Sequence, residues 1–276
     1  MDALTLYIDG IAFWAPALPG WPLARAVLRG EATAQDPPAA RPAPPLLAAN
    51  ERRRAPDSVL LALEVASRAW VESGHDAGTT ASVFTSAHGD LAITDALCQT
   101  LAGDPLLLSP TRFHHSVHNA ASGYWAIAAG SRAASTALAA YEHSFGAGLL
   151  EAACQVAADD APVLLVGSDT AACGALASVN RSRGLLAVAL LLSPTRSTAS
   201  LWSLAWSLDG GTTAPLAPPA LRTAAAQALA GNAMADALPL FEALAVEQPI
   251  TLALRVSAAR HLALHLQPLG QAPAKA

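Results

Sequence analysis

The spacing of hydrophobic residues along this chain switches between a two-residue period and a helical period. Alternating or short continuous apolar runs predict strands over residues 4–14, 81–86, 135–138, 162–166, 185–193, 201–208, 250–256 and 261–266. Apolar positions three and four residues apart predict helices over residues 57–73, 93–101, 120–129, 145–157, 220–230 and 234–245. Strands and helices therefore follow one another along most of the chain.

Prolines interrupt this pattern between the first strand and the first long helix. Residues 16–56 include the pairs Pro37-Pro38 and Pro44-Pro45. Proline lacks an amide hydrogen and fixes φ, so it is excluded from helix interiors and central strands. The sequence therefore predicts a long surface loop here.

The order of these elements predicts an α/β fold. Strands that alternate with helices are typical of a mainly parallel sheet that is covered on both faces. The elements after residue 185 repeat the arrangement in a shorter form, which indicates two successive α/β layers, the second one abridged. A chain of 276 residues is long enough to bury the core of such a domain without cross-links.

The composition favours a protein partner and excludes a nucleic acid. Hydrophobic residues make up 53% of the chain and charged residues 13%, which leaves apolar surface for an oligomeric contact unless the many alanines account for it. The net charge of −5 provides no footprint for nucleic acid. The basic run Arg52-Arg53-Arg54 suits the phosphate or carboxylates of an acidic partner. A solvent-exposed segment that leads into the next helix explains this run equally well.

The cysteines and the apolar runs indicate a cytoplasmic protein. Cys98, Cys154 and Cys173 have no metal-ligand spacing, and their odd number fits buried structural thiols in a reducing compartment. The chain begins without a basic signal-peptide segment, and its longest apolar run, 185–192, is far shorter than the roughly 20 residues of a membrane-spanning helix. We expect no membrane span, no metal and no cofactor.

Residues 135–148 predict a strand, a tight turn and a helix, which is a frame that can present a nucleophile. Glu142 stands at or next to the turn position, and a shift of one residue would place Tyr141 or His143 there. No cysteine occurs between Cys98 and Cys154, although acyl transfer from a thioester needs a thiolate or an activated hydroxyl. Glu142 either accepts hydrogen bonds from the turn amides or simply caps the helix.

Ser144 offers a hydroxyl on the same turn. The signature of a hydrolase nucleophile elbow is Gly-x-Ser-x-Gly, but Glu142 occupies the position of the first glycine. No Asp-then-His order with a supporting pattern follows downstream. A serine hydrolase is thus a minor alternative to a serine that forms local hydrogen bonds.

Three segments of the chain resemble the N-terminal half of β-ketoacyl synthases. They are the turn region 135–148, the end of a predicted strand at Gly167-Ser168-Asp169, and the run SPTRFHHSVHNAASGYW over residues 109–125. The nearest likeness is to the short ketosynthase-like chain-length factors of bacterial aryl polyene pathways. The resemblance implies a thiolase-like layered fold in one domain, 1–276, with a better-matching half over 4–184, a shortened half over 185–266 and a tail over 267–276.

The same resemblance implies a subunit without catalytic residues. Ketosynthases also use histidines in their second half, and this chain has none between His143 and His261. Similar proteins pair with an active ketosynthase as a heterodimer and shape the pocket for the growing acyl chain, which an acyl carrier protein delivers. Arg52, Arg53 and Arg54 would then contact that acidic carrier. The alternatives are a malonyl-carrier-protein decarboxylase that uses Glu142 and a serine hydrolase that uses Ser144.

The resemblance also suggests residues for a substrate tunnel or a subunit interface. Aromatic side chains complement acyl or conjugated chains, although core packing or dimer contact is the commoner role. His114 and His118 would share a helix face, as metal-binding pairs do, but no further ligand stands nearby, so polar packing is favoured. The predicted tunnel or interface residues are Phe113, His114, His118, Tyr124, Trp125 and Phe145.

Overall fold

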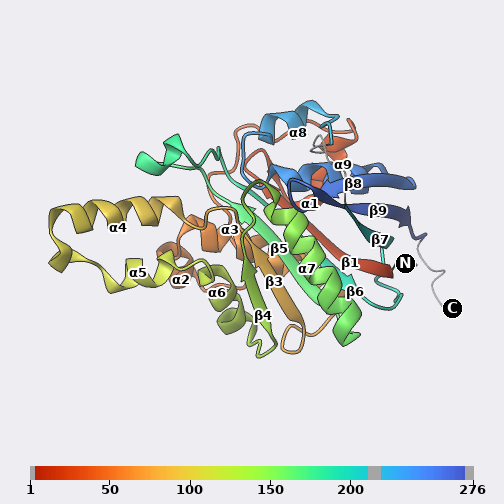
Figure 1. Cartoon of the computed structure of the whole chain (residues 1–276), viewed down its shortest axis with the longest axis horizontal. Helices are drawn as coiled ribbons and strands as arrows, with labels where there is room; N and C mark the ends of the chain where they lie inside the picture. The colour runs from red at the N-terminus through yellow and green to blue at the C-terminus, as the bar shows by residue number, and fades with distance from the viewer. Residues whose placement is uncertain (1–3, 211–218, 271–276) are drawn as a thin grey trace.

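The computed structural model describes residues 4–210 and 219–270, which form one mixed sheet with helices on both faces (Figure 1). Nine strands lie in this part of the chain: β1 (Leu4–Ala15), β2 (Leu18–Pro19), β3 (Ala81–Thr85), β4 (Ser135–Leu138), β5 (Val163–Asp169), β6 (Leu186–Ser193), β7 (Trp202–Gly210), β8 (Ile250–Arg255) and β9 (Arg260–Pro268). The α-helices are α1 (Trp21–Leu28), α2 (Ala49–Arg54), α3 (Asp57–Ser73), α4 (Leu91–Gly103), α5 (Pro110–Ser116), α6 (Ala120–Ala129), α7 (Ser144–Asp159), α8 (Ala224–Leu229) and α9 (Leu238–Val246). Short 3-10 helices are η1 (Pro105–Leu107), η2 (Tyr141–His143), η3 (Ala175–Ser178) and η4 (Ala235–Ala237).

The sheet order is β4-β3-β5-β6-β1-β7-β9-β8, and β2 pairs with the end of β1. Among the described strands, only the pairs of β3 with β4 and with β5 are parallel, so the prediction of a mainly parallel sheet is wrong. The described connection from β5 to β6 contains only η3 and no α-helix that could serve as a parallel crossover. A fully buried run such as β6 fits a strand of either direction, which is why its sequence did not predict the pairing.

Alternate side chains of the central strands face two separate hydrophobic cores. On β6, Val188 and Leu190 point into the core beneath α7 and α9, whereas Ala187 and Ala189 point into the core beneath α3. The predicted covering of both faces is confirmed. Because the face beneath α3 carries small residues, this helix packs close to the sheet.

The strands of the second half continue the same sheet instead of building a second layer within the described residues. β7 pairs with the first residues of β1, and β9 and β8 follow outward from β7. The second half is therefore shortened, as expected, but it shares one sheet with the first. β1 is the strand that joins them.

The proline-rich stretch is not a continuous loop. α1 and α2 lie within it, together with β2, so this prediction is corrected. Pro22 stands in the first turn of α1, where no amide hydrogen is needed, and no further proline follows until Pro37. The spacing of the prolines thus leaves room for a two-turn helix.

Helices α4 and α5, with η1 between them, form an arm over residues 91–116 that extends away from the sheet (Figure 1). Leu106 is 93% exposed and Phe113 is 59% exposed on this arm. Cys98 on α4 and Cys154 on α7 are also exposed, and Cys173 is half-buried, so the prediction of buried thiols is wrong. No helix in residues 4–210 and 219–270 is long and apolar enough to cross a membrane.

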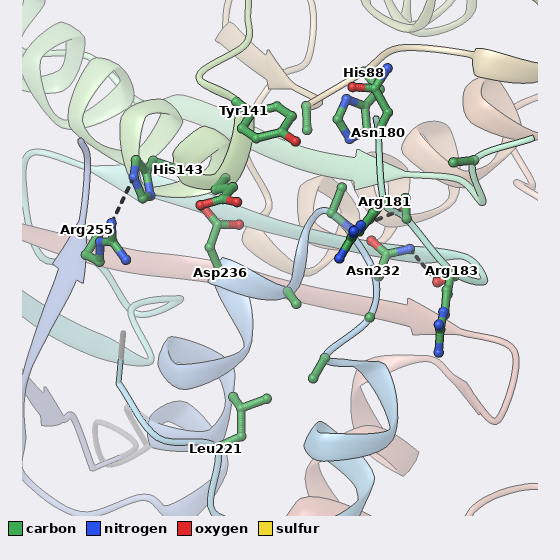
Figure 2. A pocket seen from close by; sticks show the side chains of 18 of the residues that line it. His88, Tyr141, His143, Asn180, Arg181, Arg183, Leu221, Asn232, Asp236 and Arg255 are labelled. Atoms are coloured by element: carbon green, nitrogen blue, oxygen red, sulfur yellow. Dashed lines mark hydrogen bonds between the residues drawn. The ribbon is translucent and has the colours of Figure 1, made fainter. Parts of the chain in front are cut away.

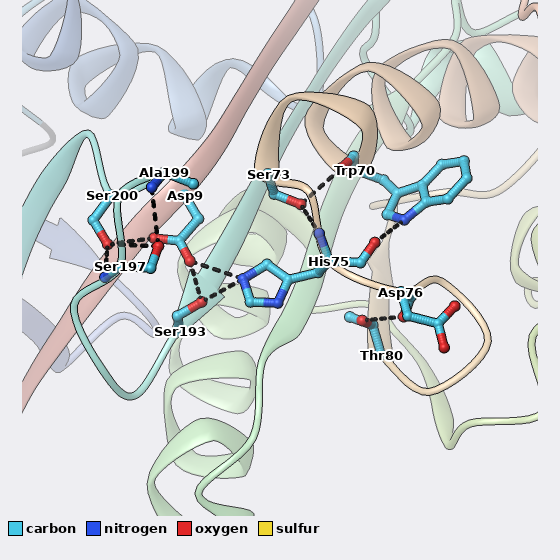
Figure 3. A network of polar contacts seen from close by, with 10 residues as sticks. All are labelled: Asp9, Trp70, Ser73, His75, Asp76, Thr80, Ser193, Ser197, Ala199 and Ser200. Atoms are coloured by element: carbon cyan, nitrogen blue, oxygen red, sulfur yellow. Dashed lines mark hydrogen bonds and ion pairs between the residues drawn. The ribbon is translucent and has the colours of Figure 1, made fainter. Parts of the chain in front are cut away.

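A buried carboxylate, Asp9, joins four segments at the middle of β1 (Figure 3). Its Oδ2 accepts a hydrogen bond from Ser193 Oγ at the end of β6 (2.6 Å) and lies 2.8 Å from His75 Nε2 in the turn after α3. Its Oδ1 accepts from Ser200 Oγ just before β7 (2.7 Å). Ser193 and Asp9 share the same imidazole nitrogen, so this trio is not the relay of a hydrolase, in which histidine uses both nitrogens.

Gly10 follows Asp9 and lets α3 lie against β1. A Cβ atom added at Gly10 would stand 2.0 Å from the carbonyl oxygen of Ala69 in α3, which is shorter than any van der Waals contact. We expect Gly10→Ala to lower the free energy of unfolding by about 3 kcal/mol or more, because helix and strand must move apart. Urea unfolding followed by circular dichroism measures the change.

Gly123→Ala is the matched control for this substitution. Gly123 lies inside α6, and nothing stands within 4 Å of the position that an added methyl group would take, so the helix should gain roughly 0.5–1 kcal/mol. Equal stability of the Gly10→Ala variant and the wild type would contradict the close approach of α3 to β1.

Candidate functional site

The predicted turn between strand and helix is present, and its strained residue is Tyr141. β4 ends at Leu138, η2 spans Tyr141–His143, and α7 begins at Ser144. Tyr141 has a φ of 52°, a left-handed conformation that is rare for a bulky residue and costs about 1–3 kcal/mol. This strained position precedes Glu142 by one residue.

Ser144 holds the turn closed from inside the protein. Its side chain is fully buried, its Oγ donates to the carbonyl of Tyr141 (2.8 Å), and it accepts from the amide of Ala140 (3.0 Å). The neighbouring His143 instead directs its Nε2 at Arg255. Both interactions of the Ser144 hydroxyl are therefore used for the turn, as expected for a serine with local hydrogen bonds, and its proton is directed at the Tyr141 carbonyl.

The carboxylate at the start of α7 comes from Asp236 of η4, and not from Glu142. Asp236 Oδ2 accepts hydrogen bonds from the amides of Phe145 (2.9 Å) and Gly146 (3.3 Å). Glu142 is exposed and forms no hydrogen bond through its side chain within the described residues. The expectation that Glu142 takes the turn amides is corrected, because Asp236 already occupies the amides at the start of the helix.

Burial sets the protonation of Asp236. It raises the pKa of this carboxyl to about 7; the amides of Gly146 and Phe145 oppose the rise, and the carboxylate of Asp169 adds to it. Burial likewise raises the pKa of Asp169, against hydrogen bonds from the Ala87 amide and the Ser86 hydroxyl. Two carboxyl groups therefore lie beneath the turn, and a negative charge on Asp169 makes ionisation of Asp236 less favourable.

A pocket of about 900 Å³ opens beside this turn (Figure 2). Its wall includes Tyr141, Glu142 and His143, which the sequence analysis had singled out. Burial, followed by the charge of Arg255, lowers the pKa of His143, so its imidazole is neutral and accepts from the Arg255 guanidinium (3.3 Å). The other polar residues that line the pocket are His88, Asn180, Arg181, Ser182, Arg183, Asn232, Asp236 and Arg255.

The six residues predicted for a tunnel or interface do not line this pocket. Trp125 and Phe145 are core residues that pack edge to face against Trp70 and Phe241. Phe113 lies exposed on the arm. The predicted residues thus divide between the core and the outer surface.

The histidines of this region make local polar contacts. The Tyr124 hydroxyl lies 2.9 Å from His115 Nε2, and His118 Nε2 donates to the carbonyl of Ser86 (3.0 Å). His114 lies against the ring of His115. His118 follows the end of α5, so it does not share a helix face with His114, and that prediction is corrected.

The three arginines of the basic run have different surroundings. Arg52 is half-buried and donates to the carbonyls of Pro44 (3.3 Å) and Leu47 (3.0 Å), which fastens the preceding loop. Arg53 contacts the side chain of Asn50 in its own helix. Arg53 and Arg54 are both exposed, so they are the two that a partner can reach.

Sequence reasoning missed Asp236, Arg181, Arg183 and Arg255. Asp236 and Arg255 are single charged residues in apolar segments, and Arg181 and Arg183 stand two positions apart in an irregular segment without a recognised motif. Isolated charges were the one available signal, since Asp236 interrupts the apolar helical pattern before α9. No group of three metal-ligating side chains within the described residues is arranged to hold an ion.

The family is defined by a sequence match that covers most of the chain. The family model for the β-ketoacyl synthase N-terminal domain matches residues 28–248, and the chain belongs to this family. No curated protein matches the sequence.

Solved ketosynthase structures share the fold over nearly the whole chain. A chain in the complex of the ketosynthase ApeO with its chain length factor ApeC from Xenorhabdus doucetiae has a TM-score of 0.69 at 24% identity, covering 96% of this chain and 99% of that one. The ishigamide ketosynthase/chain length factor has a TM-score of 0.68 at 16% identity, and the match covers 96% of this chain and 100% of that one. A chain in AntDE:AntF, the complex of a type II ketosynthase with its acyl-carrier protein, has a TM-score of 0.73 at 11% identity. The match covers 98% of this chain and 100% of that one. The expected thiolase-like ketosynthase fold is confirmed.

Replacing Asp236 should change how stability depends on pH. The folded pKa of about 7 lies above the value of about 3.9 for an unfolded Asp, so between these pH values the folded state alone holds the proton. Stability from this group therefore falls as pH rises from about 4 to 7, by at most about 1.4 kcal/mol per pH unit. In urea unfolding at pH 5, 6, 7 and 8, Asp236→Asn should gain stability relative to wild type as pH rises.

Asp160→Asn, an exposed carboxylate just after the same helix, is the control for this series. The interpretation fails if the stability of Asp236→Asn runs parallel to that of the wild type from pH 5 to 8.

Proposed function

We propose that this chain is the non-catalytic chain-length-factor subunit of a ketosynthase heterodimer that acts in aryl polyene synthesis or a related polyketide or fatty-acid-like pathway. Catalysis belongs to the partner. The observation that carries the proposal is the state of the turn: its strained residue is Tyr141, and a carboxylate, Asp236, already occupies the helix amides behind it.

Both parts of an acyl-transfer site are missing at this turn. Acyl transfer needs a nucleophile beside a base, and it needs amide donors for the oxyanion that develops on the thioester. The Tyr141 hydroxyl donates to the carbonyl of Val179 (3.2 Å), which is no general base. The amides of Phe145 and Gly146 already donate to Asp236, so they are not available to bind an oxyanion.

A partner surface fits the exposed apolar side chains near the sheet edge. β4 ends the sheet order and pairs only with β3, so its outer edge offers free backbone groups. Ile127, on the adjoining α6, is 83% exposed, and Leu106 and Leu107 on the arm are 93% and 73% exposed. Large apolar residues exposed on the surface, as on α6 and on the arm, are typical of protein interfaces.

Co-expression with a competent ketosynthase from the same genome tests the function. We expect a one-to-one complex on size exclusion. When an acyl-carrier-protein thioester is added, intact mass spectrometry should find the acyl group on the ketosynthase and none on this chain. A covalent acyl adduct on this chain, or carbon dioxide release from malonyl carrier protein by this chain alone, would contradict the proposal and favour an enzyme that uses the pocket rim at Glu142.

The same complex can be probed with two matched variants. Ile127→Glu places a charge in the proposed interface and should abolish co-purification. Val71→Glu changes a residue that is 68% exposed on α3, away from the arm, and should leave the complex intact.

We further propose that Arg53 and Arg54 contact the acidic acyl carrier protein. Arg52 is left unchanged in the test, because it supports the loop before α2. The double substitution Arg53→Glu, Arg54→Glu should weaken carrier-protein binding to the complex about tenfold, with a larger effect at low salt. Surface plasmon resonance measures this. Arg260→Glu, an exposed arginine at the start of β9, is the control, and equal affinities for both variants would refute the contact.

A further inference from the structure

The pocket beside the turn is rimmed by arginines that form no ion pair with a carboxylate in the part of the chain that the structure describes. Arg181 and Arg183 come from the segment between η3 and β6, and Arg255 comes from the end of β8. Within the described residues, the arginines that form ion pairs are others, namely Arg25, Arg29, Arg41 and Arg68. The pocket therefore gathers three guanidinium groups that are not engaged in ion pairs among the described residues.

Buried contacts hold Arg181 and Arg183 in place. Ser182 between them is buried, and its Oγ donates to the carbonyl of Thr170 (2.7 Å) and accepts from the amide of Ala233 (3.1 Å). Arg181 and Arg183, on either side of this buried serine, are exposed and line the pocket.

The stem of Arg183 is braced by the loop before η4. Its Cδ lies 3.2 Å from the position a Cβ of Gly231 would take, so the side chain packs on this glycine. The side-chain amide of Asn232 donates to the carbonyls of Arg183 (3.1 Å) and Asp169 (3.2 Å). The rim is thus fixed to the end of β5 before any ligand arrives, which lowers the entropic cost of binding.

The acidic groups of the pocket do not cancel this positive charge. Glu142 and Asp236 face it, but Asp236 Oδ2 is used by the amides of α7. In Figure 2, Arg255 and His143 lie to one side of Asp236, and Arg181 and Arg183 lie to the other. His143 contacts Arg255 and supplies no negative charge. The rim at Arg181 and Arg183 is therefore free to receive an anion.

The rest of the wall is apolar. Leu221, Leu254, Pro219 and Pro239 line it together with several alanines. A volume of about 900 Å³ is within the range of small-molecule sites and exceeds what a bare phosphate ion needs. A ligand that fills this space has an apolar body as well as a charged head.

We propose that this pocket binds an amphiphilic anion, a carboxylate or phosphate monoester on an apolar chain, with its head on Arg181 and Arg183 and its chain along Leu221 and Leu254. Planar guanidinium groups bind both kinds of head through paired hydrogen bonds. The proposal concerns the isolated chain and does not depend on pairing with a ketosynthase.

Isothermal titration calorimetry on the full chain tests this, with octanoate, octyl phosphate, inorganic phosphate and octylamine as probes. We expect binding of octyl phosphate, octanoate or both, and much weaker binding of inorganic phosphate and octylamine. Whichever octyl anion binds more tightly assigns the head as phosphate or carboxylate. Failure of both octyl anions to bind, or equal binding of octylamine, overturns the proposal.

Substitution of Arg181 and Arg183 shows whether the anion binds through these side chains or only through its apolar chain. The double variant Arg181→Gln, Arg183→Gln should weaken binding of the preferred octyl anion by about tenfold or more. Both side chains are exposed and form no hydrogen bond within the described residues, so the fold should be kept, which circular dichroism checks. Arg196→Gln, an exposed arginine outside the pocket, should leave the affinity unchanged. Unchanged affinity in the double variant, or an equal loss with Arg196→Gln, overturns the assignment of the head.

Discussion

The arrangement of strands and helices in this molecule depends on the contacts of one buried carboxylate, that of Asp9. It receives hydrogen bonds from Ser193 at the end of β6 and from Ser200, two residues before β7, and it lies against His75 after α3. A carboxylate removed from water is tolerated only when such partners surround it. Since β1 pairs with β6 on one side and β7 on the other, this contact fixes the register of both halves of the sheet.

Asp236 performs a similar task between the second half and the turn. Its carboxyl accepts a hydrogen bond from the amide of Phe145, which is 91 residues away in the sequence. This bond connects η4 to the start of α7. The amides at the helix N-terminus favour a carboxylate at this position, although burial outweighs them and raises its pKa to about 7. One side chain therefore links the second half of the chain to the turn and occupies the first amides of α7.

The sequence predicted much of the fold and less of the site. The strands and long helices were predicted to within a few residues, and the turn at residues 139–143 was found, because each depends on local spacing of apolar residues. Strand direction was wrong beyond β5, and α1 was hidden among prolines. Of the pocket, the sequence indicated Tyr141, Glu142 and His143 but none of its arginines, which carry no local pattern.

The sequence by itself determined where strands and helices form, that no cysteine lies between Cys98 and Cys154, and that a turn joins a strand to a helix near Glu142. These are properties of neighbouring residues, whose conformational preferences and burial act over short distances. Only the tertiary structure decided that Asp236 caps α7, that Tyr141 takes the strained conformation, and that arginines from two segments rim one pocket. Contacts between residues so far apart in the chain are chosen by how the sheet and helices pack, which local preference does not encode.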